Sequence, residues 1–226
     1  MTTVYCFSGT GHSLAVARFF ARRLDTEVRS VSGNFLTPET AVVIFPVYCQ
    51  NIPAPVRHFL KTLRADRAVL IAVHGGISSG RVLYEAAKLV SGTIIAAASV
   101  PTGHTFLGED DSFDEASLMP IFDRIAHPAP AQIPRTKKIW YASLFPGWRS
   151  RMSVRLIRSD ACDGCSRCEE SCPAAAMHRG KANRRCIRCL RCVTVCPRGA
   201  LSYRTSGFLR KYLSRHAHET KTVLYL

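Results

Sequence analysis

The 226-residue sequence has no apolar run close to the roughly 18 residues that a membrane-spanning helix needs. Its most apolar stretches, Val69–Val73 and Ile94–Val100, have only the length of strands. The opening residues Met-Thr-Thr-Val-Tyr include neither the basic segment nor the small-residue cleavage pattern of a secretory signal. We therefore expect a cytoplasmic protein without a transmembrane segment.

The usual catalytic signatures are also missing. We find no Ser/His/Asp set, no paired-carboxylate site and no zinc-protease motif. Nothing in the sequence identifies an organic substrate, so whether the protein is an enzyme stays open. An aromatic-glycine RNA signature and a helix-turn-helix pattern are absent too, and we expect no nucleic-acid partner.

Cysteine, in contrast, is abundant and regularly placed. Eight of the ten cysteines form two runs with one spacing, C-x2-C-x2-C-x3-C-P. This is the spacing of a bacterial two-cluster ferredoxin, in which the fourth cysteine of each run binds the other cluster. It predicts one [4Fe–4S] cluster on Cys162, Cys165, Cys168 and Cys196, and a second on Cys186, Cys189, Cys192 and Cys172.

Two other uses of these cysteines are less consistent with the pattern. Structural zinc takes four tetrahedral ligands, usually from two separated pairs, whereas each run here already holds four cysteines. A disulfide framework requires an oxidising compartment, which the missing secretory signal does not indicate. The repeat of the whole motif, with a proline after both fourth cysteines, makes coincidence negligible.

Positive charge is concentrated in the part of the chain that contains these runs. Residues 131–226 hold 20 Lys and Arg but 5 Asp and Glu, while residues 1–130 hold 11 of each. Two oxidised clusters with eight thiolates carry about −4, which Arg167, Arg188 and Arg191 between the ligands would offset. The remaining excess indicates redox partner proteins with an acidic docking surface.

The first 130 residues alternate strand and helix patterns, which predicts a doubly wound α/β fold with a five-stranded parallel sheet. The predicted strands are Thr3–Phe7, Val28–Val31, Ala41–Tyr48, Ala68–His74 and Thr93–Ser99. The predicted helices are Ser13–Leu24, Pro53–Leu63, Ser79–Val90 and Glu115–Ala126. Strands that are apolar throughout fit a sheet covered on both faces.

Four segments follow from these patterns. We expect an α/β domain over residues 1–134, ending in a proline-rich stretch, and a basic and aromatic linker over 135–157. A small cluster domain then spans 158–204, and a tail over 205–226 packs on one of the domains. The cluster domain is too small to bury a large apolar core, so the clusters should form its core.

A glycine loop joins the first predicted strand to the first helix. In Ser8-Gly9-Thr10-Gly11-His12-Ser13, backbone N–H groups, hydroxyls and a helix N-terminus can all face one phosphate. The loop lacks the third glycine of a Rossmann motif and the Gly-Lys of a Walker motif. A phosphate site and a plain glycine turn are both consistent with it.

Further loops should lie at the same edge of the sheet, because ligands of open α/β sheets bind at the carboxyl ends of the strands. Pro46, Val47 and Tyr48 follow the third strand, and Tyr48 can stack on a planar ring. His74, Gly75 and Gly76 follow the fourth strand, where glycine backbone can approach a ligand closely.

With these loops and both cysteine runs, the chain resembles the flavodoxin–ferredoxin fusion proteins of anaerobic bacteria and archaea. The resemblance implies a flavodoxin-like domain that binds FMN, followed by a ferredoxin domain with two [4Fe–4S] clusters. It places Ser8 to Ser13 on the FMN phosphate, with Pro46–Tyr48 and His74–Gly76 near the ring. His12 is a departure, because loops of this family usually carry Asn there.

These features predict an electron-transfer protein that links single-electron clusters to a flavin able to carry one or two electrons. A flavin-dependent reductase of a small molecule is one alternative, and a flavin-free ferredoxin with a docking domain is another. The sequence does not specify the donor, the acceptor or the oligomeric state.

Overall fold

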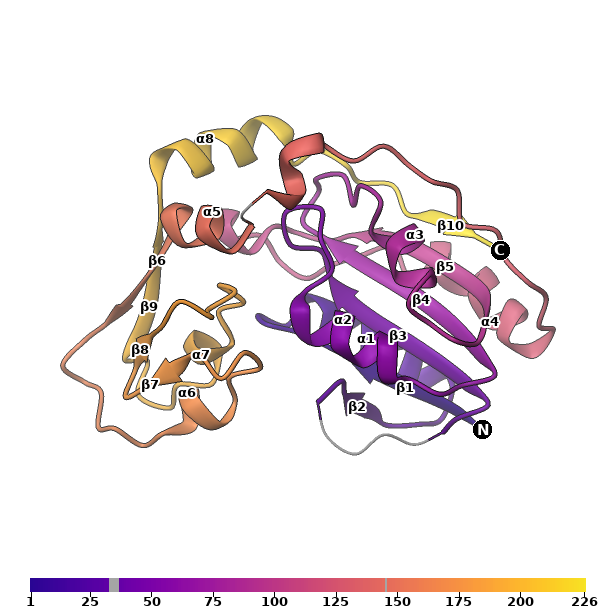
Figure 1. Ribbon diagram of the computed structural model, residues 1–226, viewed down its shortest axis with the longest axis horizontal. Coiled ribbons are helices and arrows are strands. Elements are labelled where there is room, and N and C mark those ends of the chain that lie inside the picture. The colour runs from indigo at the N-terminus through magenta and orange to yellow at the C-terminus, as the bar shows by residue number, and fades with distance from the viewer. Residues whose placement is uncertain (33–36, 145) are drawn as a thin grey trace. The chain divides into compact units, whose positions relative to one another are not determined.

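The computed structural model describes residues 1–32, 37–144 and 146–226, which form two compact units. Unit 1 comprises Met1–Ser143 together with Ala217–Leu226, and unit 2 comprises Leu144–His216 (Figure 1). None of the helices in the described ranges is long and apolar enough to cross a bilayer.

Unit 1 is built on a mostly parallel sheet, six strands wide in the described residues, with the order β10-β5-β4-β3-β1-β2. Its strands are β1 (Thr2–Cys6), β2 (Val28–Ser30), β3 (Thr40–Pro46), β4 (Arg67–His74), β5 (Thr93–Pro101) and β10 (Val223–Tyr225). β1 to β5 pair in parallel, so β1, β3, β4 and β5 end at the same edge. β10 pairs antiparallel with β5.

The sixth strand corrects the expected five-stranded sheet. β10 comes from the end of the chain, which returns to unit 1 and pairs Val223 with Ser99 and Tyr225 with Ala97. An unpaired edge strand exposes backbone donors and acceptors, and β10 covers that edge of β5.

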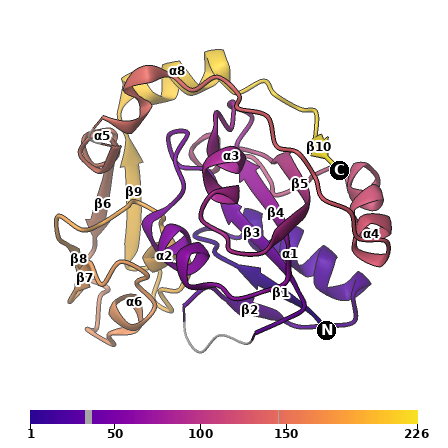
Figure 2. The same cartoon turned by 45° about the vertical axis from the view of Figure 1, so that its right-hand side comes forward.

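The helices of unit 1 lie on both faces of the sheet (Figure 2). They are α1 (His12–Arg23), α2 (Ala54–Thr62), α3 (Val82–Ala87) and α4 (Met119–Ala126), with short 3-10 turns η1 (Thr105–Leu107), η2 (Ala116–Leu118) and η3 (Trp140–Ser143). The predicted helix 115–126 is divided into η2 and α4, because Pro120 lies in the first turn of α4 and favours a new helix start.

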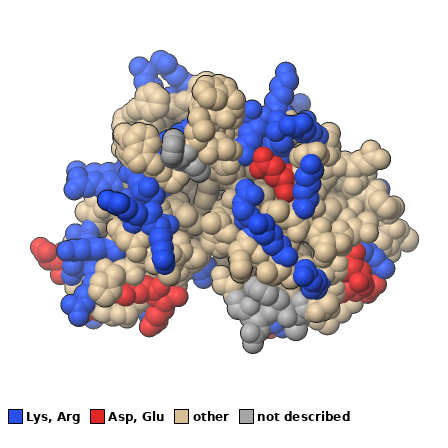
Figure 3. All heavy atoms as spheres, viewed as in Figure 1, with Lys and Arg blue, Asp and Glu red and all other residues tan. Residues whose placement is uncertain are grey.

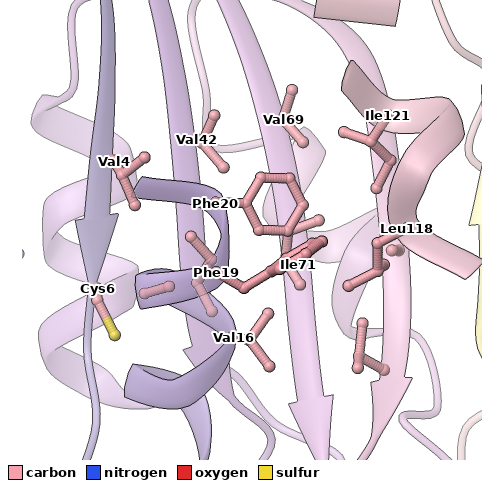
Figure 4. Close-up of a cluster of buried hydrophobic side chains, with 14 of the residues drawn as sticks. Val4, Cys6, Val16, Phe19, Phe20, Val42, Val69, Ile71, Leu118 and Ile121 are labelled. Carbon is pink, nitrogen blue, oxygen red and sulfur yellow. The ribbon is translucent and has the colours of Figure 1, made fainter. Parts of the chain in front are cut away.

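The main core lies between the sheet and helices α1 and α4 (Figure 4). Val4, Val42 and Val69 point from neighbouring strands toward Phe20 of α1 and Ile121 of α4. Alternate strand residues face the other way, where the Tyr5 ring packs 4.9 Å from the Phe59 ring of α2. The sheet is thus buried on both faces, as its continuous apolar strands predicted.

Residues 135–143, expected as linker, pack within unit 1. The Thr136 hydroxyl donates to the Gly80 carbonyl, and the Lys138 ammonium pairs with Glu85 at 3.0 Å. The side chain of Lys138 is only 9 % exposed, so this ion pair fixes the segment against the carboxyl edge of the sheet.

Unit 2 is a small α/β unit in which two strand pairs carry the cysteine loops. Its elements are α5 (Pro146–Ser153), β6 (Val154–Arg158), α6 (Arg167–Glu170), β7 (Met177–His178), β8 (Lys181–Ala182), α7 (Arg191–Thr194), β9 (Leu201–Thr205) and α8 (Gly207–His216). β6 pairs with β9, and β7 pairs with β8, both antiparallel. The unit therefore begins before the expected boundary at 158 and ends beyond 204.

Candidate functional site

The two cysteine runs form a structural repeat with an offset of 24 residues. The order β6-α6-β7 recurs as β8-α7-β9, and each strand pair joins one half to the other. The backbone hydrogen bond from Ser159 to Ala200, at 2.9 Å, has its counterpart from Asn183 to Ala176, at 2.8 Å. The two halves are therefore interlocked, which brings the end of one run next to the beginning of the other.

The backbone between the cysteines repeats as well. Three pairs of equivalent residues have positive φ: Gly164 and Arg188, Ser166 and Leu190, and Ala175 and Gly199. For residues other than glycine this conformation costs on the order of 1–3 kcal/mol, and it concentrates at functional sites. It turns each run back on itself, so that the thiols of one run surround a common space.

Two hollows of similar size result. The first hollow is lined by Cys162, Cys165, Cys168 and Cys196. The second hollow is lined by Cys172, Cys186, Cys189 and Cys192. Each hollow therefore has three cysteines of one run and the fourth of the other, which are the two sets that the spacing predicted.

The cysteines suit a multi-iron cluster in two respects: thiolates are its usual ligands, and the four thiols of each set lie around a hollow. Among the described residues, no three His, Cys, Asp or Glu side chains converge as they would around one metal ion. In a [4Fe–4S] cube each thiolate binds a different iron, so the four sulfur atoms lie farther apart than the ligands of a single ion. The Ala176 N–H also donates to the Cys172 sulfur at 3.2 Å, a contact that favours negative charge on that sulfur.

The cysteines of the second hollow are more buried than those of the first. Burial raises the pKa of Cys189 to about 11 and that of Cys192 to about 12, with further increases from neighbouring thiols that include Cys172. In the first hollow, the Gly164 N–H and then the Arg158 side chain lower the pKa of Cys162, and Cys165 is exposed. Thiols as buried as Cys192 become thiolates only with a cation beside them, which bound iron would supply.

Arginines surround the first hollow more than the sequence suggested. Arg167, Arg179 and Arg198 line it, and Arg198 pairs with Asp163 at 3.0 Å. Arg191 lines the second hollow, as expected. Arg188 instead donates to the Val154 carbonyl at 2.9 Å and lines neither hollow. Arg179 and Arg198 were missed because each lies outside the ligand spacing and comes near only through the fold.

In unit 1 the predicted loops do meet at the carboxyl edge of the sheet. Gly11, with φ of 114°, precedes α1, and its N–H donates to the Ser8 hydroxyl at 3.1 Å. In the described residues, the Nδ1 atoms of His12 and His74 are buried without a hydrogen-bond partner. A helix N-terminus and an unpaired imidazole nitrogen at its first residue fit a phosphate.

Other parts of the chain already occupy much of this edge. The Thr10 and Thr105 hydroxyls share a hydrogen bond of 2.9 Å. A Cβ on Gly75 would lie 2.6 Å from the His104 ring, and one on Gly76 would lie 3.1 Å from the Ala217 carbonyl carbon. The glycines that were expected to approach a flavin ring are thus covered by residues of unit 1 itself.

Acidic side chains lie near His12 at this edge of the sheet. Burial lowers the pKa of His12, while the carboxylates of Asp111, Asp110 and Glu109 act on it in the opposite direction. These acidic side chains therefore lie close enough to His12 to disfavour an added phosphate. The predicted FMN residues fit the phosphate end in backbone geometry, but the ring end does not fit while His104 and Ala217 lie on Gly75 and Gly76.

His74 and Tyr48 complete the predicted set. His74 ends β4, is 5 % exposed and has its pKa lowered by burial to about 4, so it is neutral at physiological pH. Tyr48 is half-buried, and its backbone forms an isolated bridge with Asn51. Pro46 and Val47 are half-buried at the end of β3.

One family comparison bears on these sites. Residues 183–202 match the family model of the 4Fe-4S binding domain, and this segment contains Cys186, Cys189, Cys192 and Cys196. No curated protein matches the sequence. The chain therefore carries a 4Fe-4S binding domain, which together with the cysteine cluster at 162–196 supports iron–sulfur electron transfer with at least one [4Fe–4S] cluster.

Proposed function

We propose that the protein is an electron carrier with two [4Fe–4S] clusters, each held by three cysteines of one run and the fourth of the other. The observation that carries the proposal is the lining of the two hollows. Cys196 lies with the first three cysteines of the first run, and Cys172 with those of the second. When bound, each cluster supplies a site for one electron at low potential.

The residues around the cysteines hold the clusters and stabilise their charge. The positive-φ residues aim the thiols inward, and the strand pairs β6–β9 and β7–β8 fix the two runs against each other. Arg167, Arg179 and Arg198 stabilise the more negative, reduced state of the cluster in the first hollow.

The first hollow is the proposed point of electron exchange with a partner protein. Cys165 is exposed there, whereas Cys186 and Cys192 of the second hollow are buried. Asp163 pairs with Arg198, and Glu169 accepts a hydrogen bond from the Arg179 N–H. The rim of the first hollow is consequently suited to an acidic redox partner, with charge complementarity governing orientation and association rate.

FMN in unit 1 is a second part of the proposal. It is supported by the strand order β2-β1-β3-β4-β5, which is the flavodoxin-like order, and by the unpaired His12 at the start of α1. Ser8, Gly9, Thr10, Gly11, His12 and Ser13 would hold the phosphate, with Tyr48 and His74 nearer the ring. Bound flavin would let the protein connect one-electron and two-electron carriers.

Binding a flavin ring requires His104 and Ala217 to leave Gly75 and Gly76. A flavin-free protein, in which unit 1 serves as a docking domain, is therefore the main alternative. A reductase with its own organic substrate is the other alternative, and it would also need a substrate-sized opening beside the flavin ring, at the edge where His104 and Ala217 lie on Gly75 and Gly76.

The test is the composition of protein purified without oxygen. We expect about eight iron and eight sulfide per chain, as two cubes require, with flavin measured in the same sample. Four iron per chain would contradict the second cluster, and zinc in place of iron would contradict the proposal as a whole. Flavin content decides between the flavin-containing and flavin-free forms independently of the iron.

A further inference from the structure

Helices α5 and α8 of unit 2 flank one end of the β6–β9 ribbon, the end opposite Leu201 and the first hollow. Val154 pairs with Thr205 at this end, and the Ser206 N–H donates to the Ser153 carbonyl at 2.8 Å. Arg158 pairs with Leu201 at the other end, next to the cysteine runs. A five-residue strand is about 17 Å long, and Leu201, which lines the first hollow, lies at the other end of it, so the ribbon places the helices away from the first hollow. Figure 1 shows α5 and α8 at one end of β6 and β9, and α6 of the first cysteine run at the other.

Large apolar side chains are exposed on both helices. Trp148 and Met152, one helical turn apart on α5, are 56 % and 65 % exposed, and Phe208 on α8 is 81 % exposed. Residues four apart lie on the same face of a helix. Exposed apolar side chains gathered at one end of a small unit indicate an interaction surface.

The same end of unit 2 is uniformly basic. Residues 144–158 and 203–216 contain no Asp or Glu. Their cationic residues are Arg149, Arg151, Arg155, Arg204, Arg210, Lys211 and Arg215 toward this end, and Arg158 at the end next to the first hollow. Figure 3 shows Lys and Arg side chains over α8 and along the neighbouring ribbon, with uncharged surface beside them.

We propose that this surface, formed by Trp148, Met152 and Phe208 with Arg210, Lys211 and Arg215, docks on the face of an anionic lipid bilayer. The three apolar side chains are more than half exposed on their helices, and cations adjoin them in sequence. Such an arrangement suits the boundary between headgroups and acyl chains, with aromatic and aliphatic groups below the phosphates and cations beside them.

Two features favour a bilayer over an acidic protein as the occupant. The surface consists of single projecting side chains, whereas a protein interface has a packed apolar centre within a polar rim of mixed character. Its charges have one sign over two chain segments far apart in sequence, and this matches a continuous anionic surface. The cluster in the first hollow, on the far end of the ribbon, stays accessible to a redox partner.

The test uses the complete chain carrying Trp140→Phe, which leaves Trp148 as the sole tryptophan. The protein is mixed with vesicles of phosphatidylcholine alone or of phosphatidylcholine with phosphatidylserine. We expect flotation and a blue shift of Trp148 emission only with the anionic vesicles, with both effects reduced by salt. No blue shift with anionic vesicles would overturn the proposal, as would equal binding to both kinds of vesicle.

Two triple variants that remove the same charge test whether the cations of α8 make the contact with the vesicle. The triple variant Arg210→Gln, Lys211→Gln, Arg215→Gln should lower the vesicle partition coefficient about a hundredfold, at about fivefold per cation. The control Arg18→Gln, Arg57→Gln, Lys61→Gln removes the same charge from exposed residues of unit 1 and should change it little. Equal loss in both variants would mean that net charge alone drives binding and would contradict the assignment.

Phe208→Ser provides a second variant that keeps the charge and replaces one exposed side chain. It should reduce binding several-fold while iron content and circular dichroism stay unchanged, which separates docking from misfolding. Unchanged partition of this variant, or binding to an acidic protein without any binding to anionic vesicles, would overturn the bilayer as the occupant.

Discussion

The two candidate cofactor sites of this chain differ in what lies on them. In unit 2, two sets of four cysteines line two hollows. In unit 1, the loops at the carboxyl edge of the sheet meet as expected, but His104, Thr105 and Ala217 lie on them. A motif predicts which residues meet, whereas the segments that cover a site come from parts of the chain that the motif does not contain.

The largest expected effect comes from removing one ligand of a hollow. Cys168→Ala should reduce iron and sulfide from about eight to about four per chain, because one cube loses a thiolate while the other retains all four. Iron and acid-labile sulfide assays on anaerobically purified protein measure this. Content equal to that of the wild type would contradict the ligand assignment, and Cys49→Ala, an exposed cysteine outside the runs, is the control.

Lowering the pH should destabilise unit 1, because His74 is buried in its neutral form. His74 has a pKa of about 4 in the folded state and about 6.5 when unfolded, so the unfolded state gains its proton first as pH falls. The free energy of unfolding is therefore unaffected by His74 above pH 6.5. It falls by about 3 kcal/mol as the pH is lowered from 6.5 to 4.

Denaturant unfolding at pH 7 and pH 4.5, followed by Trp140 fluorescence in a Trp148→Phe background, measures this loss. His74→Gln should reduce the pH dependence between these values, since the glutamine amide does not titrate, while His12 and His104, whose pKa values burial also lowers, account for a remainder. His58→Gln, at an exposed position of α2, serves as the control and should leave the pH dependence intact. A pH dependence in His74→Gln equal to that of the wild type would contradict the role of His74.

The acidic segment near His12 provides a graded test of the phosphate site. Asp110→Asn with Asp111→Asn should strengthen FMN binding about tenfold by removing two carboxylates that act on His12. Thr10→Asp should weaken it by a similar factor, because a carboxylate then faces the phosphate. Titration of the apoprotein with FMN, followed by flavin fluorescence, measures both. Unaltered affinity in both variants would place the flavin elsewhere or exclude it.

The smallest expected effect is on the potential of the cluster in the first hollow. Arg198→Gln removes a positive charge that stabilises the reduced state, so the midpoint potential should fall by tens of millivolts, on the order of the Coulomb energy at this range. Arg204→Gln, on the exposed side of β9, is the matched control. Redox titration followed by electron paramagnetic resonance measures the shift, and an equal shift in the control would contradict a local effect.

Local patterns predicted the features that depend on neighbours in sequence. The strand and helix periods gave five strands of the sheet, and the cysteine spacing gave the two sets of thiols around the hollows. The repeat offset of 24 residues also appears in the backbone, as at Gly164 and Arg188.

What the sequence did not predict depends on contacts between distant segments. β10 joins the sheet from the end of the chain, and Lys138 fixes a supposed linker onto Glu85. Asp110 and Asp111 lie near His12, almost a hundred residues earlier in the chain. Arg188 lies between ligands in sequence but is turned to the Val154 carbonyl. These contacts join residues far apart in the chain, so neither the periodicity of a helix or strand nor the spacing of a motif predicts them.

The crosswise exchange of the fourth cysteines is tested most directly by comparing four single variants. Electron paramagnetic resonance of the remaining cluster should be the same in Cys172→Ala and Cys189→Ala, which both damage the second hollow. The spectra of Cys196→Ala and Cys165→Ala should likewise agree with each other and differ from the first pair. If Cys172→Ala instead gives the spectrum of Cys165→Ala, each run binds its own cluster and the exchange is contradicted.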